Sequence, residues 1–388
     1  MSQEKIFILC LNSGSSSLKF AIYEIHSSKV SFAAGGQLKN SGEQASLKVI
    51  DSAGKPVIEK SENFLNHSHA VKLIIDTLRQ LGYSSAAAVG HRIVHGGRHF
   101  TEPVRVDKNV LNKLRETITF APLHLPNEIA VIEAVSAHFP KVPQIACFDT
   151  AFHSKMPNVA KTFALNRSLS SLGIQRYGFH GLSCEYIVSV IKPRANHKMI
   201  IAHLGSGSSI TAVRGKQSID TSMGLTPAGG VMMGTRTGDI DPGVLTYLMR
   251  EKNYTANELD ELIYKKSGLS GVSGITSDMK ELMEKRKSSP AAKLAIEMFC
   301  YQVSKCIAGL AAALGGIGKL VFTGGIGESA PVIRREICKR LDVLGIELDG
   351  KKNQANSDII SSDKSSCSVR VIKTNEELII ARHVRNFA

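Results

Sequence analysis

Four side chains suited to binding a small anion stand in irregular, glycine- or proline-rich segments of the chain. Arg92, Arg236, His180 and His124 each have glycine or proline close by on both sides. A guanidinium group is a planar, permanently charged fork that matches carboxylate or phosphoryl oxygens. Each side chain taken alone could be structural. Their common setting predicts a site for a small anion.

Two loops of similar composition, 193 positions apart, suggest that the anion is a phosphate. The segments 7–16 and 200–209 each begin as an apolar run and end in glycine and serine, with Gly14 aligned on Gly207. A second strand-like run follows each loop, so the pattern predicts strand, tight loop and strand, twice. Glycine, backbone N–H groups and serine hydroxyls suit phosphate oxygens. Two such loops could grip a nucleotide across a cleft, and ordinary hairpins are the alternative.

A third loop of this kind follows a β-branched strand. Residues Lys319–Thr323 predict a strand that runs into the glycines of 324–329, and Pro331 fits the first turn of the next helix.

Near the C-terminus, Thr374 and Glu377 predict a capping box at the start of the last helix. None of the candidate residues has the spacing of a zinc site, which favours magnesium held by carboxylates and phosphates.

These loops must be positioned by an α/β framework. The segment Phe64–Leu81 has the amphipathic pattern of a helix ending at Gly82, and Val142–Phe148 is a short apolar strand. Composition then changes to loop-rich sequence, which places a domain boundary near residue 150. The apolar stretch Ala291–Leu314 carries three charges and is expected to be a core helix rather than a membrane span.

Composition narrows the class of protein. The chain has 388 residues, 43% of them hydrophobic, which is enough for two packed domains. Its net charge of +14 invites a nucleic-acid interpretation, but the basic residues are scattered and there is no Trp, so a basic cleft for small anions is preferred. Seven cysteines without C-x-x-C spacing predict reduced, buried thiols, and no signal peptide is recognised, so a cytoplasmic protein without a membrane partner is expected.

Seven motifs together resemble the acetate and propionate kinase family over nearly the whole chain. They are Asn12-Ser-Gly-Ser-Ser-Ser-Leu-Lys19, Gly90-His-Arg-Ile-Val-His-Gly-Gly97, Phe148-Asp-Thr-Ala-Phe-His153, Arg176-Tyr-Gly-Phe-His-Gly181, Met233-Gly-Thr-Arg-Thr-Gly-Asp-Ile-Asp-Pro242, Phe322-Thr-Gly-Gly-Ile-Gly-Glu328 and Thr374-Asn-Glu-Glu377. The resemblance implies a duplicated ribonuclease H-like α/β fold of the actin, Hsp70 and sugar kinase type, with a central cleft and usually as a homodimer. The domains would be 1–150, completed by a C-terminal helix at about 373–388, and 151–372.

The resemblance also implies roles for particular residues. It assigns Asn12 and Glu376 to magnesium or manganese, Asp149 to the place of a catalytic aspartate, and His180, Arg236 and Arg92 to stabilising the transferring group. Arg92 would also bind the acyl substrate, with an apolar pocket from Val94, Leu123, Phe179 and Pro227. ATP would be bound by Lys19, His203, Leu204, Gly205, Ser206, Gly207, Asp278, Met279, Lys280, Gly324, Gly325, Ile326, Gly327 and Glu328.

The chain departs from the family pattern at five positions. Ser206, Ser329 and Leu125 each replace an Asn, Lys280 replaces an Arg, and Cys184 replaces a His. Three of the five fall in the nucleotide half, and lysine cannot reproduce an arginine stacked on a purine. The expected activity is reversible transfer of the γ-phosphoryl group of ATP to acetate. A propionate kinase is the alternative within the class, and a non-catalytic nucleotide-binding scaffold or a nucleic-acid-binding protein are the alternatives outside it.

Overall fold

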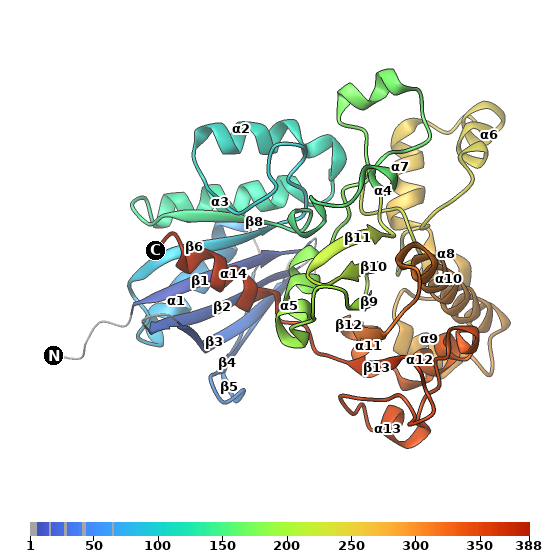
Figure 1. Cartoon of the computed structure of the whole chain (residues 1–388). Coiled ribbons are helices and arrows are strands. Elements are labelled where there is room, and N and C mark those ends of the chain that lie inside the picture. Colours follow the sequence, from blue (N-terminus) through green and yellow to red (C-terminus); the bar gives the residue numbers. More distant parts are fainter. Residues whose placement is uncertain (1–5, 15–16, 27–28, 41–43, 64–65) are drawn as a thin grey trace. The chain divides into compact units, whose positions relative to one another are not determined.

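The computed structural model describes residues 6–14, 17–26, 29–40, 44–63 and 66–388 (Figure 1). By internal contacts the chain divides into unit 1, Met1–Phe152 with Asn375–Ala388, and unit 2, His153–Thr374. The boundaries expected from the sequence lie within two residues of these positions. Ser15 and Ser16 of the first serine–glycine loop, and Phe64 and Leu65 of the first predicted helix, lie outside the described residues.

Unit 1 is built on an eight-stranded sheet. Its spatial order is β5-β4-β3-β2-β1-β6-β8-β7, with β1 antiparallel to β2 and parallel to β6. The strands are β1 (Phe7–Ser13), β2 (Ser17–His26), β3 (Lys29–Asn40), β4 (Gln44–Asp51), β5 (Pro56–Asn63), β6 (Ala86–Ile93), β7 (Val104–Arg105) and β8 (Gln144–Phe148). The main helices are α1 (His67–Gln80), α2 (Lys108–Glu116), α3 (Leu125–His138) and α14 (Glu376–Arg385).

Unit 2 is built on a five-stranded sheet in the order β11-β10-β9-β12-β13. The strands are β9 (Lys198–Leu204), β10 (Ser208–Arg214), β11 (Gln217–Thr221), β12 (Lys319–Thr323) and β13 (Ser368–Val371). The helices are α4 (Asn158–Lys161), α5 (Gly181–Ile191), α6 (Pro242–Lys252), α7 (Ala256–Lys265), α8 (Gly268–Ser273), α9 (Met279–Lys285), α10 (Pro290–Leu314), α11 (Gly324–Ser329), α12 (Pro331–Cys338) and α13 (Gly350–Gln354).

Five strands of the unit 1 sheet have the same topology as the five-stranded sheet of unit 2. In unit 1 the strands β3-β2-β1 are antiparallel neighbours, and β6 and β8 follow as parallel strands. In unit 2, β11-β10-β9 are antiparallel and β12 and β13 follow as parallel strands. The two serine–glycine loops join corresponding strands, β1 to β2 and β9 to β10. The strand–loop–strand pattern predicted twice from the internal repeat is therefore found, and the duplicated α/β fold implied by the family resemblance is confirmed.

The central strand of unit 1 has helices on both faces. Every residue of β1 is buried, and alternate residues of a strand point to opposite faces of the sheet. Phe7, Leu9 and Leu11 belong to the core cluster that also contains residues of α1 and α3. Gly90 of β6 faces α14, because an added Cβ would lie 2.4 Å from Ile380 and 2.6 Å from Val384. The C-terminal helix α14 thus packs closely on β1 and β6, which belong to the N-terminal part of the sequence (Figure 1).

Unit 2 has its core around helix α10. By length and composition alone α10 could cross a membrane, but its buried side chains, such as Phe299, Val303 and Ile307, belong to the core cluster of this unit. This agrees with the prediction of a core helix. Pro331 stands at the first position of α12, as predicted, and the seven cysteines are free thiols, six of them buried.

The predicted capping box at Thr374 and Glu377 is wrong. Helix α14 begins at Glu376, and the side chain of Asn375 caps it by accepting a hydrogen bond from the N–H of Leu378. The backbone N–H of Thr374 donates instead to Glu328 Oε1 at 3.1 Å. Asn375 also accepts a hydrogen bond from the Tyr23 hydroxyl at 3.1 Å, which orients its amide for capping.

Replacing this cap should cost stability. We expect Asn375→Ala to lower the free energy of unfolding by about 1 kcal/mol, since it removes the acceptor for an N–H of the first helical turn. Thr374→Ala should change it much less, because the Thr374 hydroxyl accepts no capping bond in the structure. Urea unfolding curves of the two variants measure the difference. The reverse ranking would contradict the assignment of the cap.

Candidate active site

Arg92 and Asp149 lie at the carboxyl ends of neighbouring parallel strands in unit 1. Strand β6 pairs Arg92 with Cys147 of β8, so Asp149, two residues beyond Cys147, points to the same face of the sheet as Arg92. Asp149 Oδ2 accepts hydrogen bonds from Arg92 Nη2 at 2.5 Å and Arg92 Nε at 3.1 Å. Asp149 is fully buried and its second oxygen, Oδ1, has no hydrogen-bond partner among the described residues.

The guanidinium of Arg92 keeps donors for a ligand. Burial lowers the pKa of Arg92, but the charges of Asp149 and Glu376 outweigh burial, and the net shift is upward. Its Nη1 donates to Asn12 Oδ1 at 3.0 Å. A guanidinium has five N–H donors, and these hydrogen bonds leave one on Nη1 and one on Nη2. Two such N–H groups form the fork that binds a carboxylate in bidentate geometry.

Asn12 and Glu376 surround the same arginine. Asn12 is the next-to-last residue of β1, on the face of the sheet that α14 covers. Its Nδ2 donates to Glu376 Oε2 at 3.2 Å and to Glu377 Oε1 at 3.4 Å. Glu376 Oε2 also lies 3.6 Å from Arg92 Nε. Burial raises the pKa of Glu376 to about 7; Arg92 opposes this, while Asp149 and Glu377 add to it.

This oxygen-rich cluster fits a hard divalent cation. The carboxyl groups of Asp149 and Glu377 stand close enough to Glu376 to raise its pKa, and a bound cation would relieve the repulsion among the three. Lys19 lies beside them, since the antiparallel pairing of β1 with β2 sets Asn12 opposite Lys19. The predicted metal ligands, the predicted catalytic aspartate and Arg92 therefore belong to one cluster of unit 1.

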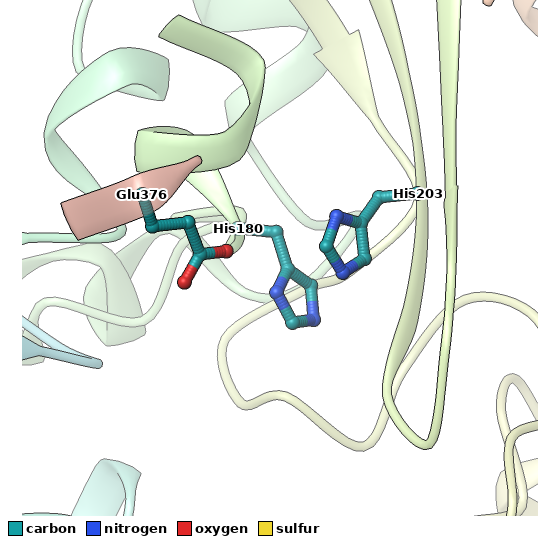
Figure 2. Close-up of side chains that lie close together, drawn as sticks. All are labelled: His180, His203 and Glu376. Atoms are coloured by element: carbon teal, nitrogen blue, oxygen red, sulfur yellow. The ribbon is translucent and has the colours of Figure 1, made fainter. Parts of the chain in front are cut away.

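In unit 2, His180 and His203 form a stacked pair. Their ring centroids are 4.3 Å apart with an interplanar angle of 12°, as Figure 2 shows. His180 immediately precedes α5 in the left-handed backbone region, with φ of 57°, an uncommon conformation for a residue other than glycine that is often found at functional sites. His203 Nδ1 is fixed by the hydroxyl of Ser183 at 2.8 Å.

Arg236 lies against the same loop as His180. A Cβ added to Gly207 would lie 3.1 Å from His180 Nε2 and 3.6 Å from Arg236 Nη1. A side chain at this position would press on His180 and touch Arg236, so glycine lets both side chains lie close to the loop. Arg236 Nη1 donates to the carbonyl of Pro227 at 3.1 Å. The structure brings together two predicted transition-state stabilisers, one pocket residue and one ATP-binding glycine.

The other predicted nucleotide loops adjoin this one. Strands β9 and β12 are parallel neighbours, and a Cβ on Gly324 would lie 2.7 Å from the carbonyl oxygen of Leu204. On the other side, the N–H of Gly234 donates to the carbonyl of Ser206 at 3.1 Å, and Gly234 also lies against Ser277, which precedes Asp278. The segments 203–207, 278–280 and 324–328 thus meet at one edge of unit 2. The expected loop at 324–329 is wrong in form, because these residues make the short helix α11 directly after β12.

Some predicted nucleotide residues have structural contacts of their own. Glu328 Oε1 accepts hydrogen bonds from the N–H of Gly324 at 2.9 Å and the N–H of Thr374 at 3.1 Å, so it ties the first residue of α11 to the segment before α14. Asp278 caps α9 through the N–H of Lys280. Met279 and Leu204 are buried, whereas Gly325 is exposed and open.

The apolar residues predicted to line the substrate pocket are divided between the units. Val94 is buried and Leu123 half-buried in unit 1, and Phe179 and Pro227 are buried in unit 2. Phe179 is fixed through its carbonyl, which contacts Nε2 of the buried His153 at 3.0 Å. His124 stands just before α3.

Two of the five departures from the family pattern have a simple structural reason. Leu125 and Cys184 are fully buried, so an apolar side chain suits each position. Ser206, Lys280 and Ser329 are exposed at the nucleotide loops. The hydroxyl of Ser329 donates to the carbonyl of Gly325.

Sequence reasoning missed two acidic residues of unit 1. Glu377, interpreted as a cap, instead accepts a hydrogen bond from Asn12. Glu128 is not among the predicted site residues, and it stands on the apolar face of α3 with Leu125, Ile129 and Ile132. An acidic residue in the middle of an apolar helical face was the signal that could have found it.

Comparisons with known proteins agree with this geometry. The solved structure of a propionate kinase from Francisella tularensis subsp. tularensis SCHU S4 is similar, with a TM-score of 0.90 and 37% identity over 98% of this chain and 99% of that chain. Porphyromonas gingivalis acetate kinase gives a TM-score of 0.86 and 36% identity over the same shares. The fold is therefore that of the two-domain acyl kinases, as the resemblance implied.

Sequence comparison gives the family itself. The acetate kinase of Rhodopseudomonas palustris (strain ATCC BAA-98 / CGA009) is 43% identical over 395 aligned residues, covering 98% of each chain. The model of the acetokinase family matches residues 7–382. The chain belongs to the acetokinase family and is an ATP-dependent kinase.

Proposed function

We propose that this enzyme transfers the γ-phosphoryl group of ATP to acetate, giving acetyl phosphate and ADP, and that the reaction is reversible. The observation that carries the proposal is the guanidinium of Arg92, oriented by Asp149 and with an N–H on each Nη left for a substrate carboxylate. The names of the relatives support acetate as the acid. The likeness to a propionate kinase structure makes propionate the second candidate.

The proposed reaction needs no general base. A short-chain acid has a pKa near that of a glutamate side chain, about 4.3, and is already ionised at pH 7. One carboxylate oxygen forms a bond to the γ-phosphorus while the bond from that phosphorus to the β,γ-bridging oxygen breaks, and ADP leaves with the electron pair. Asp149 orients Arg92 in this account and abstracts no proton.

The main task of the protein is to stabilise charge on the transferring group. In a loose transition state, charge is spread over the phosphoryl oxygens, which positioned cationic and hydrogen-bonding groups stabilise. Arg236 and His180, which converge beside Gly207, are the groups of unit 2 proposed for this role. The adjoining segments 203–207, 278–280 and 324–328 are proposed to bind ATP.

Asn12 and Glu376 are proposed to hold Mg²⁺, with Mn²⁺ as a substitute. When bound, the ion would neutralise charge on the phosphate oxygens. We expect Glu376→Ala to raise the Mg²⁺ concentration needed for half-maximal activity about tenfold or more, because it removes a carboxylate ligand. Glu377→Ala is the matched variant and should shift it less. A magnesium titration of both variants measures this, and a larger shift for Glu377→Ala would contradict the assignment.

The altered nucleotide loops should relax the choice of base. Ser206, Lys280 and Ser329 are exposed and offer shorter or non-stacking side chains, while the glycines beside the phosphates remain. We expect GTP or ITP to be used with kcat/KM within about tenfold of ATP, because one lost contact is worth roughly 1–1.5 kcal/mol. Competition between nucleotides at fixed acetate measures this. A hundredfold preference for ATP would show that other residues compensate.

An acyl-hydroxamate assay tests the proposed function. ATP, Mg²⁺ and a series of short-chain acids are incubated with the enzyme, and hydroxylamine traps any acyl phosphate. We expect acetate to give the highest kcat/KM, with propionate also used, because one methylene changes discrimination by only about 1–3 kcal/mol. A higher kcat/KM for propionate would select the second candidate, and no product with any acid would refute the proposal.

We also propose that the enzyme is a cytoplasmic homodimer that acts without a nucleic acid or membrane partner. Seven free thiols suit a reducing compartment. Helix α6 has no buried residue and exposes Val244, Tyr247 and Met249, an apolar surface that association of two copies would cover. Sedimentation equilibrium measures the oligomeric state, and a monomer at micromolar concentration would contradict the dimer.

A further inference from the structure

Glu128 is a buried carboxyl group of unit 1 that the proposed reaction does not use. It lies on α3, is 2% exposed, and has the apolar neighbours Leu125, Ile129 and Ile132 on its helix face. Burying a carboxyl group among apolar side chains is costly unless a hydrogen bond compensates. The buried carboxyl group of Glu128 is therefore expected to make a compensating hydrogen bond.

That contact is with the backbone of the segment that follows Arg92. Glu128 Oε2 accepts a hydrogen bond from the N–H of Val94 at 3.1 Å. Val94 lies just beyond the end of β6, where the sheet supplies no partner for this N–H, and only two residues beyond Arg92. On either side the chain is held by other groups: the Ile93 carbonyl accepts from the N–H of Asp149, and the Gly96 N–H donates to the Thr150 hydroxyl.

Glu128 makes no ion pair with Arg92, although their charges interact. Among the described residues, the guanidinium contacts Asp149, Glu376 and Asn12. Burial raises the pKa of Glu128 to about 8, although the Val94 hydrogen bond and Arg92 lower it in part, and Asp149 raises it. At pH 7 Glu128 is mainly the neutral acid, so it can accept from Val94 without competing with Asp149 for Arg92.

We propose that Glu128 is a positioning residue of the acyl-substrate site, and that its hydrogen bond to Val94 sets how the enzyme distinguishes acids of different chain length. The bond fixes the backbone that carries the Val94 side chain, proposed to contact the acyl group. The inference rests on the proposed function. It predicts that one neutral acceptor atom at this position is enough, since Oε1 has no hydrogen-bond partner among the described residues.

Two variants of similar shape test this. Glu128→Gln keeps a neutral oxygen acceptor, whereas Glu128→Met fills the space without a strong one. We expect Glu128→Met to raise the KM for acetate about tenfold, since Val94 loses its partner, and to lower the acetate-to-propionate ratio of kcat/KM. The KM for ATP should stay within about twofold. Glu128→Gln should keep the KM for acetate and the acid ratio within about threefold of the wild type.

The readouts distinguish positioning from a general structural role. A structural role alone would lower the melting temperature and the active fraction but leave the KM for acetate and the acid ratio unchanged in Glu128→Met, and that result would overturn the proposal. A folded Glu128→Gln enzyme with a strongly raised KM for acetate would overturn it too, even if Glu128→Met fails to fold. Glu133→Gln, on the exposed side of α3, is the control and should match the wild type.

The wild-type enzyme is assayed first in the same acid series. If it forms no acyl phosphate with any acid, the proposed function fails, whatever the Glu128 variants do. If it does and the Glu128→Met and Glu128→Gln variants behave alike, only the inference about Glu128 fails.

Discussion

Arg92→Ala should lower kcat by about 10²-fold or more while the protein stays folded, because a charge-assisted contact to the reacting groups is worth several kcal/mol. Arg92 is the shared partner of Asp149, Asn12 and Glu376, and its remaining N–H groups are those proposed to bind the substrate carboxylate. The KM for acetate should rise as well. Steady-state kinetics with varied acetate measure both constants.

Two further variants sharpen this result. Arg92→Lys keeps the charge but loses the planar fork, so we expect it to recover only a small part of the activity. Arg105→Ala removes an exposed arginine of the same unit and should behave like the wild type. Near-normal turnover of Arg92→Ala, with a melting curve like that of the wild type, would show that Arg92 does not touch the reacting groups.

Arg236→Ala should also lower kcat by about 10²-fold or more, but with a different pattern. Arg236 lies beside His180 and Gly207 and is assigned to the transferring phosphoryl group, so kcat should fall while the KM for acetate changes little. Arg250→Ala on the exposed helix α6 is the matched control. A rise in the KM for acetate with unchanged kcat would contradict this assignment. It would show that Arg236 contributes to ground-state binding of the acid and not to stabilising the transferring phosphoryl group.

Local sequence patterns predicted several elements well. The strand Lys319–Thr323 has the bounds of β12, and the apolar stretch Ala291–Leu314 differs from α10 by one residue. These segments combine strong periodicity or β-branched composition with clear end signals such as Gly324 and Gly315. The repeated strand–loop–strand pattern likewise predicted the β1–β2 and β9–β10 pairs, whereas the duplicated fold was implied by the family resemblance.

Local sequence patterns could not predict contacts between residues that lie far apart in the sequence. The predicted capping box at Thr374 is wrong because Asn375, the next residue, caps α14. The N–H of Thr374 instead donates to Glu328 of α11, which is distant in the sequence. The pairing of Arg92 with Asp149 depends on β6 and β8 being parallel neighbours, which spacing in the sequence does not reveal. The contact of Glu128 with Val94 depends on how α3 packs against β6.

Roles of single residues came from the resemblance to the acetate and propionate kinases and not from periodicity. Periodicity gives no reason to choose Arg92 over Arg98, for example. The structure adds a physical reason for some of these assignments, because it groups Arg92, Asp149 and Asn12 in unit 1. In unit 2 it stacks His180 on His203 (Figure 2) and brings His180 and Arg236 close to Gly207.

The most direct test of the central claim follows the oxygen atoms of the acid. The enzyme is incubated with ATP, Mg²⁺ and acetate labelled with ¹⁸O in both carboxylate positions, and the product is examined by ³¹P NMR. Direct attack of the carboxylate on the γ-phosphorus predicts acetyl phosphate whose phosphorus signal carries the isotope shift of one bonded ¹⁸O. Release of inorganic phosphate at a rate independent of acetate, with no labelled acyl phosphate, would contradict the account.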